Sequence, residues 1–218
     1  MTEIDQGLIM KMLDYCYEKA VVGLPGFETA EELAQGYMSR CGSVESNAKK
    51  LVAVQAVKAG VSGFVTGIGG IITLPVAIPV NVGSIVYLQI RLISAIAVMG
   101  NRDIRSDEVK SVVYLCLCGS ASANIVKDLG LLISNKPIVN SIRGISGMTL
   151  TKINQAVGFR LLTRFGRSGF VNIIKAAPLV GGIVGGMIDA ITTRAVGKVA
   201  INHFLSEPLL LEKAEITN

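Results

Sequence analysis

Three glycines near the middle of the chain have the spacing of a nucleotide-binding loop. Gly63, Gly67 and Gly69 match the G-x-x-x-G-x-G pattern with which short-chain dehydrogenases hold a dinucleotide. That chemistry needs a strand before the loop. The preceding residues, LVAVQAVKA, continue a helical pattern, and the matching Tyr-x-x-x-Lys pair, Tyr15 and Lys19, lies upstream instead of downstream. We therefore expect no dinucleotide site, and no other pattern in the sequence indicates a cofactor.

One isolated acid could carry a different chemistry. Asp189 is flanked by GGIVGGMI and AITT. An acid in so apolar a setting is either a buried partner for a basic residue, such as Arg91 or Arg194, or a pore-lining or proton-carrying group. We expect the structural role. A closed pocket that held Asp189, Arg91 and Gln89 together would instead favour an enzyme, so these three are the candidate buried polar residues.

The histidine and cysteine residues do not have the spacing of a metal site. His203 is the only histidine, and no cysteine or carboxylate cluster accompanies it. Cys116 and Cys118 are two apart within an apolar run, which is not the C-x-x-C spacing. We expect no metal, a structural histidine, and buried, reduced thiols in a cytosolic compartment. With no catalytic residue identified, a non-catalytic role is the leading interpretation.

These positions lie on or beside a stretch, residues 59–90, that has no charged side chain. Small residues recur in its first half at intervals of three and four, which puts them on one face of a helix. The glycines of this face are Gly60, Gly63, Gly67 and Gly70. Glycine inside a helix costs roughly 1 kcal/mol relative to alanine, so we expect another helix to approach this face closely and offset the cost.

Two prolines divide the stretch. Pro75 and Pro79 lack an amide donor and clash with the preceding turn. A first helix should therefore end near Thr73, and a second should begin at the prolines and run to about Met99. The Gly-Asn dipeptide at 100–101 is a helix stop signal. The sequence thus predicts a central, glycine-rich helical hairpin that is broken at the prolines.

A last long helix is predicted over residues 178–205. Gly182 and Gly186 repeat in it the small-residue spacing of the hairpin, and we expect the two glycine faces to pack together. Amphipathic patterns and capping signals predict further helices over residues 5–22, 29–40, 107–129 and 150–165, and one that Ser43 opens. No run alternates long enough for a sheet. We predict an all-α fold, a single-domain helical bundle over residues 1–218.

The sequence is compatible with more than one environment for the hairpin, in water or in a membrane. At about 1.5 Å per residue each limb is about 24 Å long, whereas the apolar core of a bilayer is roughly 30 Å thick. Neither limb spans that core without taking in Lys58 or Arg91. A buried hairpin in a soluble domain, a re-entrant or interfacial insertion and a two-pass membrane protein are all compatible with it.

Charge is distributed unevenly along the chain. Residues 129–188 contain no acid, whereas the first 48 residues hold eight acids and three basic residues, a balance of −5. The candidate contacts for an anionic surface are Arg143, Lys152, Arg160, Arg164, Arg167 and Lys175. Each adds about 1 kcal/mol of attraction near anionic lipid headgroups. Alternatively, these cations neutralise the acidic N-terminal region or an acidic partner. Nucleic acid is disfavoured because aromatic residues are not interleaved with them.

Several ordered motifs resemble those of the EcsC family of bacterial proteins, over about residues 17–204. They are Gly23-Leu24-Pro25-Gly26, GFVTGIGGIITLPVAIPV from Gly63, Gln89, Arg91, Ala95-Ile96-Ala97, Asn154 to Arg160 (NQAVGFR) and Pro178 to Asp189 (PLVGGIVGGMID). The resemblance implies an all-helical domain linked to membranes or membrane transport, without an established active site or cofactor.

The leading hypothesis is a membrane-associated protein at the cytoplasmic face of the inner membrane. It would act through lipid contact or through helix–helix association with a membrane partner such as a transporter. The alternative is a soluble, non-catalytic interaction or regulatory module that binds an acidic protein partner. Self-association is compatible with both hypotheses.

Overall fold

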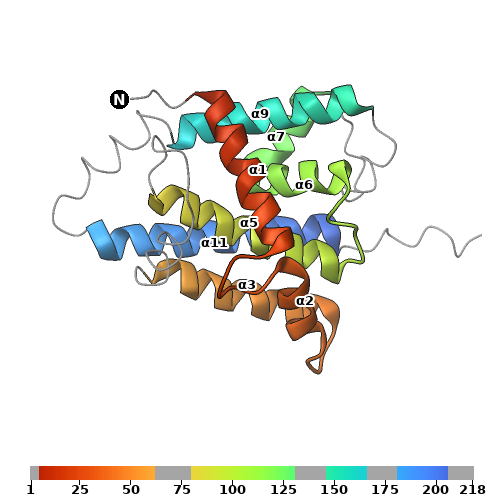
Figure 1. The fold of residues 1–218 in the computed structure, drawn as a ribbon, viewed down its shortest axis with the longest axis vertical. Coiled ribbons are helices and arrows are strands. Elements are labelled where there is room, and N and C mark those ends of the chain that lie inside the picture. Colours follow the sequence, from red (N-terminus) through yellow and green to blue (C-terminus); the bar gives the residue numbers. More distant parts are fainter. Residues whose placement is uncertain (1–4, 62–79, 131–145, 166–180, 206–218) are drawn as a thin grey trace, which may run out of the picture.

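The computed structural model describes residues 5–61, 80–130, 146–165 and 181–205, with the backbone alone at 164–165 and 181–185 (Figure 1). Every regular element in these ranges is a helix, which confirms the predicted all-α fold. The helices are α1 (Gln6–Val22), α2 (Ala30–Met38), α3 (Val44–Gly60), α5 (Val80–Met99), α6 (Asp107–Leu117), the short 3₁₀ helix η1 (Gly119–Ala121), α7 (Ser122–Asp128), α9 (Gly147–Phe165) and α11 (Gly181–Phe204).

Short polar side chains begin the helices where the sequence predicts. Thr29 Oγ1 accepts a hydrogen bond from the Glu32 amide at 3.1 Å, and Glu32 Oε2 accepts one from the Thr29 amide at 2.8 Å. This is the predicted capping box of α2. The hydroxyls of Ser43 and Ser106 likewise accept the amides three residues on, at 3.2 and 3.3 Å. Each side chain satisfies an amide that has no partner within its helix.

The centre of the bundle is α5, and α1, α2, α3, α6 and α11 pack around it (Figure 1). Seventeen of its 20 residues are buried, so it is a core helix. Among the described helices it is the one long and apolar enough to cross a membrane, but 94% of that apolar window is covered by the protein itself. Because the core helix of a water-soluble bundle has the same length and composition, α5 says little about a membrane.

The most extensive helix–helix contact among the described residues joins α3 to α11. Gly60 near the end of α3 meets Gly186 near the start of α11, and Val52 meets Gly197 further along, so the two helices run antiparallel. The missing side chains allow this approach: a Cβ on Gly197 would lie 2.6 Å from Val52 Cγ2. Of the other predicted packing glycines, Gly182 has only its backbone described, and Gly63, Gly67 and Gly70 lie outside the described residues.

By contrast, α11 runs parallel to α5. Gln89 of α5 contacts Thr193 of α11, and Gly100, 11 residues later, contacts Phe204, also 11 residues later. The end of α3 and the starts of α5 and α11 therefore lie on one side of the bundle, at the left of Figure 1. The C-terminal end of α9 lies on the same side.

The predicted stop signal at residues 100–101 is confirmed, because α5 ends at Met99. Asn101, not Gly100, adopts a positive φ of 56°. The amide of Asn101 donates to Val98 O and that of Arg102 to Ala97 O, the two hydrogen bonds of a Schellman motif. Gly100 is small for another reason, because a Cβ there would overlap the carbonyl oxygen of Phe204.

The single helix predicted over residues 107–129 is wrong. α6 ends at Leu117, and Gly119 has a positive φ of 57°, which a right-handed helix cannot continue. η1 and α7 follow as separate elements. The helix predicted over 150–165 is confirmed as α9, with Leu150, Ile153, Val157 and Leu161 all buried. The first limb of the hairpin, predicted to run as a helix to near Thr73, is wrong, because α3 ends at Gly60 and Val61 is extended, with φ −91° and ψ 107°. The proline break at 75–79 lies outside the described residues.

Candidate functional site

Gln89 is a buried polar residue that links two helices. Its side chain is 2% exposed, and its Nε2 donates hydrogen bonds to Thr193 Oγ1 at 3.2 Å and to Thr192 Oγ1 at 3.3 Å. The Thr192 hydroxyl in turn donates to the carbonyl oxygen of Asp189, one turn earlier. An amide inside an apolar core needs such partners, since losing one costs about 1–3 kcal/mol. Gln89 thus fixes the register of α5 against α11.

Arg91 is equally buried but faces another part of the core. Its Nη1 donates to the carbonyl oxygen of Glu28 at 3.1 Å. Its guanidinium carbon lies 5.7 Å from the ring centre of Tyr87 and 5.9 Å from that of Phe27, which is cation–π distance. The cation therefore holds the turn between α1 and α2 against α5.

Gln89 and Arg91 face different parts of the core, so the structure does not bring both of them together with Asp189. Two residues along a helix differ by about 200° in direction, so Gln89 faces α11 and Arg91 faces the α1–α2 turn. Asp189 is half-buried on α11 and takes part in a polar or electrostatic interaction of its own. The described residues thus do not unite the three side chains in one site, and the enzyme interpretation gains no support from this arrangement.

The four thiols differ in burial: Cys16 and Cys116 are buried, whereas Cys118, which was predicted to be buried, is half-buried and Cys41 is exposed. Burial raises the pKa of the Cys16 thiol to about 12 and raises that of Cys116 as well, so both stay protonated. Burial lowers the pKa of His203 to about 4. No group of three metal-ligating side chains occurs within the described part of the chain.

The outer face of α9 combines cations with exposed apolar groups. Met148, Lys152, Gln155 and Phe159 follow one another at intervals of three or four and form one stripe. The side chains of Met148 and Phe159 are 72% and 61% exposed. We call this stripe, together with Arg160, the α9 outer face. The helix contains no acid along its whole length.

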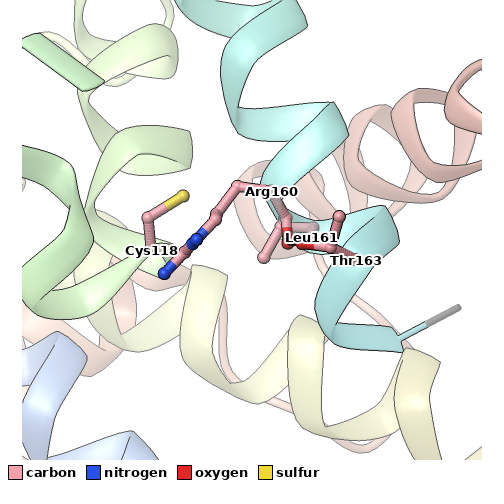
Figure 2. A pocket seen from close by; sticks show the side chains of 4 residues that line it. All are labelled: Cys118, Arg160, Leu161 and Thr163. Carbon is pink, nitrogen blue, oxygen red and sulfur yellow. Dashed lines mark hydrogen bonds between the residues drawn. The ribbon is translucent and has the colours of Figure 1, made fainter. Parts of the chain in front are cut away.

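Arg160 stands beside a shallow pocket. Its guanidinium extends toward the Cys118 thiol, and Leu161 and Thr163 complete the lining of a space of about 300 Å³ (Figure 2). Lys152 is exposed two turns earlier. Of the other predicted basic contacts, Arg164 has only its backbone described, and Arg143, Arg167 and Lys175 lie outside the described residues.

A groove of about 570 Å³ separates the α9 outer face from α1. Gln6, Met10, Gln155 and Phe159 line it, and Gln6 Nε2 donates a hydrogen bond to Gln155 O at 2.8 Å. The exposed Phe159 was not among the residues singled out in the sequence. Its position four residues after Gln155, opposite the buried stripe of α9, was the signal that could have identified it.

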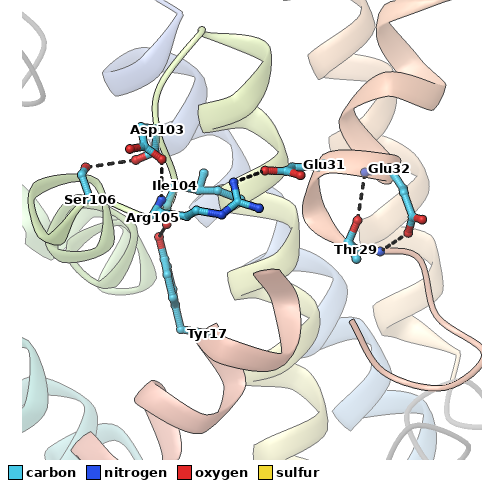
Figure 3. Close-up of polar contacts among 8 residues, drawn as sticks. All are labelled: Tyr17, Thr29, Glu31, Glu32, Asp103, Ile104, Arg105 and Ser106. Atoms are coloured by element: carbon cyan, nitrogen blue, oxygen red, sulfur yellow. Dashed lines mark hydrogen bonds and ion pairs between the residues drawn. The ribbon is translucent and has the colours of Figure 1, made fainter. Parts of the chain in front are cut away.

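A second polar region supports the fold. Tyr17 OH donates to Ile104 O at 2.6 Å, and Arg105 pairs with Glu31 at 2.5 Å, so the loop after α5 is tied to α1 and α2 (Figure 3). Burial is the main cause that raises the pKa of Tyr17 and keeps its hydroxyl protonated as a donor. These contacts position elements and offer no reactive group.

Comparison with known proteins gives no further guide to function. No protein-family model matches the chain, and no curated protein and no solved structure is significantly similar to it.

Proposed function

We propose that this protein attaches to the cytoplasmic face of a membrane and contacts anionic lipid headgroups through the α9 outer face. The observation that carries the proposal is the exposed stripe of Met148, Lys152 and Phe159, with Arg160 at its edge, on a helix without an acid. An aromatic ring flanked by basic residues is the composition of helices that lie in the lipid interface. The role is non-catalytic.

The energies involved favour reversible attachment. Each cation near an anionic surface contributes about 1 kcal/mol, and Lys152 and Arg160 together about 2. Burying the Phe159 ring in the interface adds about 2 kcal/mol more. Binding of this size is weak, so a second contact is needed for a stable membrane location.

The buried state of α5 bears on the mode of attachment. Because the protein itself covers this helix, the described bundle is complete without lipid around α5. Attachment from the surface is therefore the simplest arrangement. The EcsC resemblance implies a link to membrane transport. The proposal therefore extends to association with a membrane protein, such as a transporter, at the same membrane surface.

Vesicle flotation tests the proposal. The purified chain is mixed with vesicles of phosphatidylcholine alone, or with added phosphatidylserine. We expect the chain to bind more strongly to vesicles that contain phosphatidylserine. Arg160→Gln should reduce this strengthening by about fivefold. Phe159→Ser should weaken binding to both kinds of vesicle.

Matched controls keep the experiment specific. Lys49→Gln removes an exposed cation that is 65% exposed on α3, and Val22→Ser removes an apolar side chain that is 71% exposed on α1. Both should bind vesicles like the parent chain. Absent flotation with either lipid would contradict the proposal, and together with a detergent-free monomer it would favour the alternative, a soluble module that binds an acidic protein.

A further inference from the structure

Exposed apolar side chains gather where α3 ends and α5 and α11 begin. On α3 and α5 they are Val54, Val57, Val61 and Val80, and on α11 they are Met187, Ile188 and Ile191, each between 40% and 65% exposed. We call this group the apolar end. Neighbouring apolar side chains exposed in this way on several helices are uncommon on a protein that meets only water.

The apolar end is one surface because the helices that carry it are in contact. Gly60 touches Gly186, which places Val61 and Met187, their chain neighbours, at the same level of the α3–α11 pair. Val57 and Ile191 follow one turn further into the bundle on their respective helices. α5 contacts both helices and begins on the same side (Figure 1).

The charge around this surface fits lipid better than water. Lys58 and Asp189 border the apolar end, and both are half-buried and take part in polar or electrostatic interactions within the protein. Neither charge is therefore left without compensation when water is removed from the surface beside it.

We infer that the apolar end enters the same bilayer that the α9 outer face contacts, and that it is the second contact needed for stable attachment. The inference rests on the proposed function. It also rests on position, because the C-terminal end of α9, the helix that carries Phe159 and Arg160, lies on the same side of the bundle as the apolar end (Figure 1). The occupant of this surface is the lipid, with its acyl chains against the valines and isoleucines.

A neutral polar substitution tests this without changing the charge. Val57→Gln/Ile191→Gln alters two side chains that are 65% and 64% exposed, so the fold should tolerate it. Val22→Gln/Met38→Gln makes the matched change on α1 and α2, at side chains that are 71% and 47% exposed. Thermal unfolding of each variant verifies that it is folded before vesicle binding is measured.

We expect the Val57/Ile191 variant to lose about tenfold or more in binding to vesicles, both of pure phosphatidylcholine and with phosphatidylserine. The control pair should bind like the parent chain. The loss on neutral vesicles separates this surface from Arg160, whose substitution reduces only the phosphatidylserine increment.

Three results would overturn the inference. If the parent chain floats and the Val57/Ile191 variant floats equally, the apolar end stays out of the lipid while the proposed function stands. If the parent chain binds neither kind of vesicle, both fail. If sedimentation shows a dimer that the variant disperses, with vesicle binding unchanged, the apolar end joins two copies of this chain instead.

Discussion

Gly60 of α3 and Gly186 of α11 meet backbone to backbone. A Cβ on Gly60 would lie 3.1 Å from the Gly186 carbonyl oxygen, and a Cβ on Gly186 would overlap the carbonyl oxygen of Gly60. The helices can therefore approach this closely because Gly186 has no side chain, and a side chain at Gly60 would also be in tight contact. This contact fixes the antiparallel α3–α11 pair and, with it, the position of the apolar end.

Gly186→Ala should destabilise the fold by about 1–3 kcal/mol, because the added methyl group overlaps the backbone of α3, which cannot rotate away as a flexible side chain could. The matched control is Gly36→Ala on α2, where nothing lies within 4 Å of the added atom. That change should stabilise the protein by up to about 1 kcal/mol, since alanine is the better helix former. Urea unfolding measures both, and equal effects of the two substitutions would refute the packing argument.

The neighbouring residues Gly100 and Asn101 should respond in opposite ways. Gly100→Ala places a methyl group on the Phe204 carbonyl oxygen and should cost about 1–3 kcal/mol. Asn101→Gly should be neutral or slightly stabilising, because glycine adopts the φ of 56° without strain. Thermal unfolding of the two variants distinguishes these roles. A large loss from Asn101→Gly would mean that the asparagine side chain has a function of its own.

The link between Gln89 and Thr193 can be tested as a pair. Thr193→Val removes an acceptor of the buried Gln89 amide and should cost about 1–3 kcal/mol. Adding Gln89→Leu removes the donor that was left unsatisfied, so the double variant should lose less than the sum of the two single variants. A double-mutant cycle on the free energy of unfolding measures this coupling. Additive losses would show that the two side chains do not interact.

Protonation of His203 should make the protein less stable in mild acid. Burial lowers its pKa in the folded protein to about 4 from the usual 6.5. Between about pH 6.5 and pH 4, His203 is protonated in the unfolded chain but stays neutral in the folded chain. The free energy of unfolding therefore falls as the pH is lowered through this range, by about 3 kcal/mol at most.

Carboxylates also titrate near the lower end of this range, so the comparison is with His203→Gln. Between neutral pH and about pH 5 the variant should lose less stability than the parent chain in urea unfolding. Identical pH profiles for the two chains would show that His203 does not contribute.

Much of the helical framework could be predicted because its signals are local. Thr29 and Glu32 are three residues apart and cap the same turn, and the spacing of Leu150, Ile153, Val157 and Leu161 encodes a buried face without reference to the rest of the chain. The break at Gly119 was missed. A glycine within an apolar helical pattern is also compatible with close packing, and only its positive φ distinguishes the two roles.

The candidate surfaces were less predictable, because exposure depends on what packs nearby. The basic content of residues 129–188 is visible in the sequence, but the outward position of Phe159 beside Arg160 depends on how α1 and α6 cover the other side of α9. In the sequence Gln89 and Arg91 are close enough to suggest one site. In the structure Gln89 contacts α11, whereas Arg91 contacts the α1–α2 turn on the opposite side of α5.

By itself the sequence determined the helices, their caps and the glycines that make close approach possible, since backbone propensity and residue spacing act within a few turns. The tertiary structure alone decided that α5, apolar enough for a membrane, is covered by other helices, and that Val57, Val61, Met187 and Ile191 are not. The physical reason is that a side chain is buried by residues that are distant in the sequence. The local sequence pattern does not specify whether those residues pack against it.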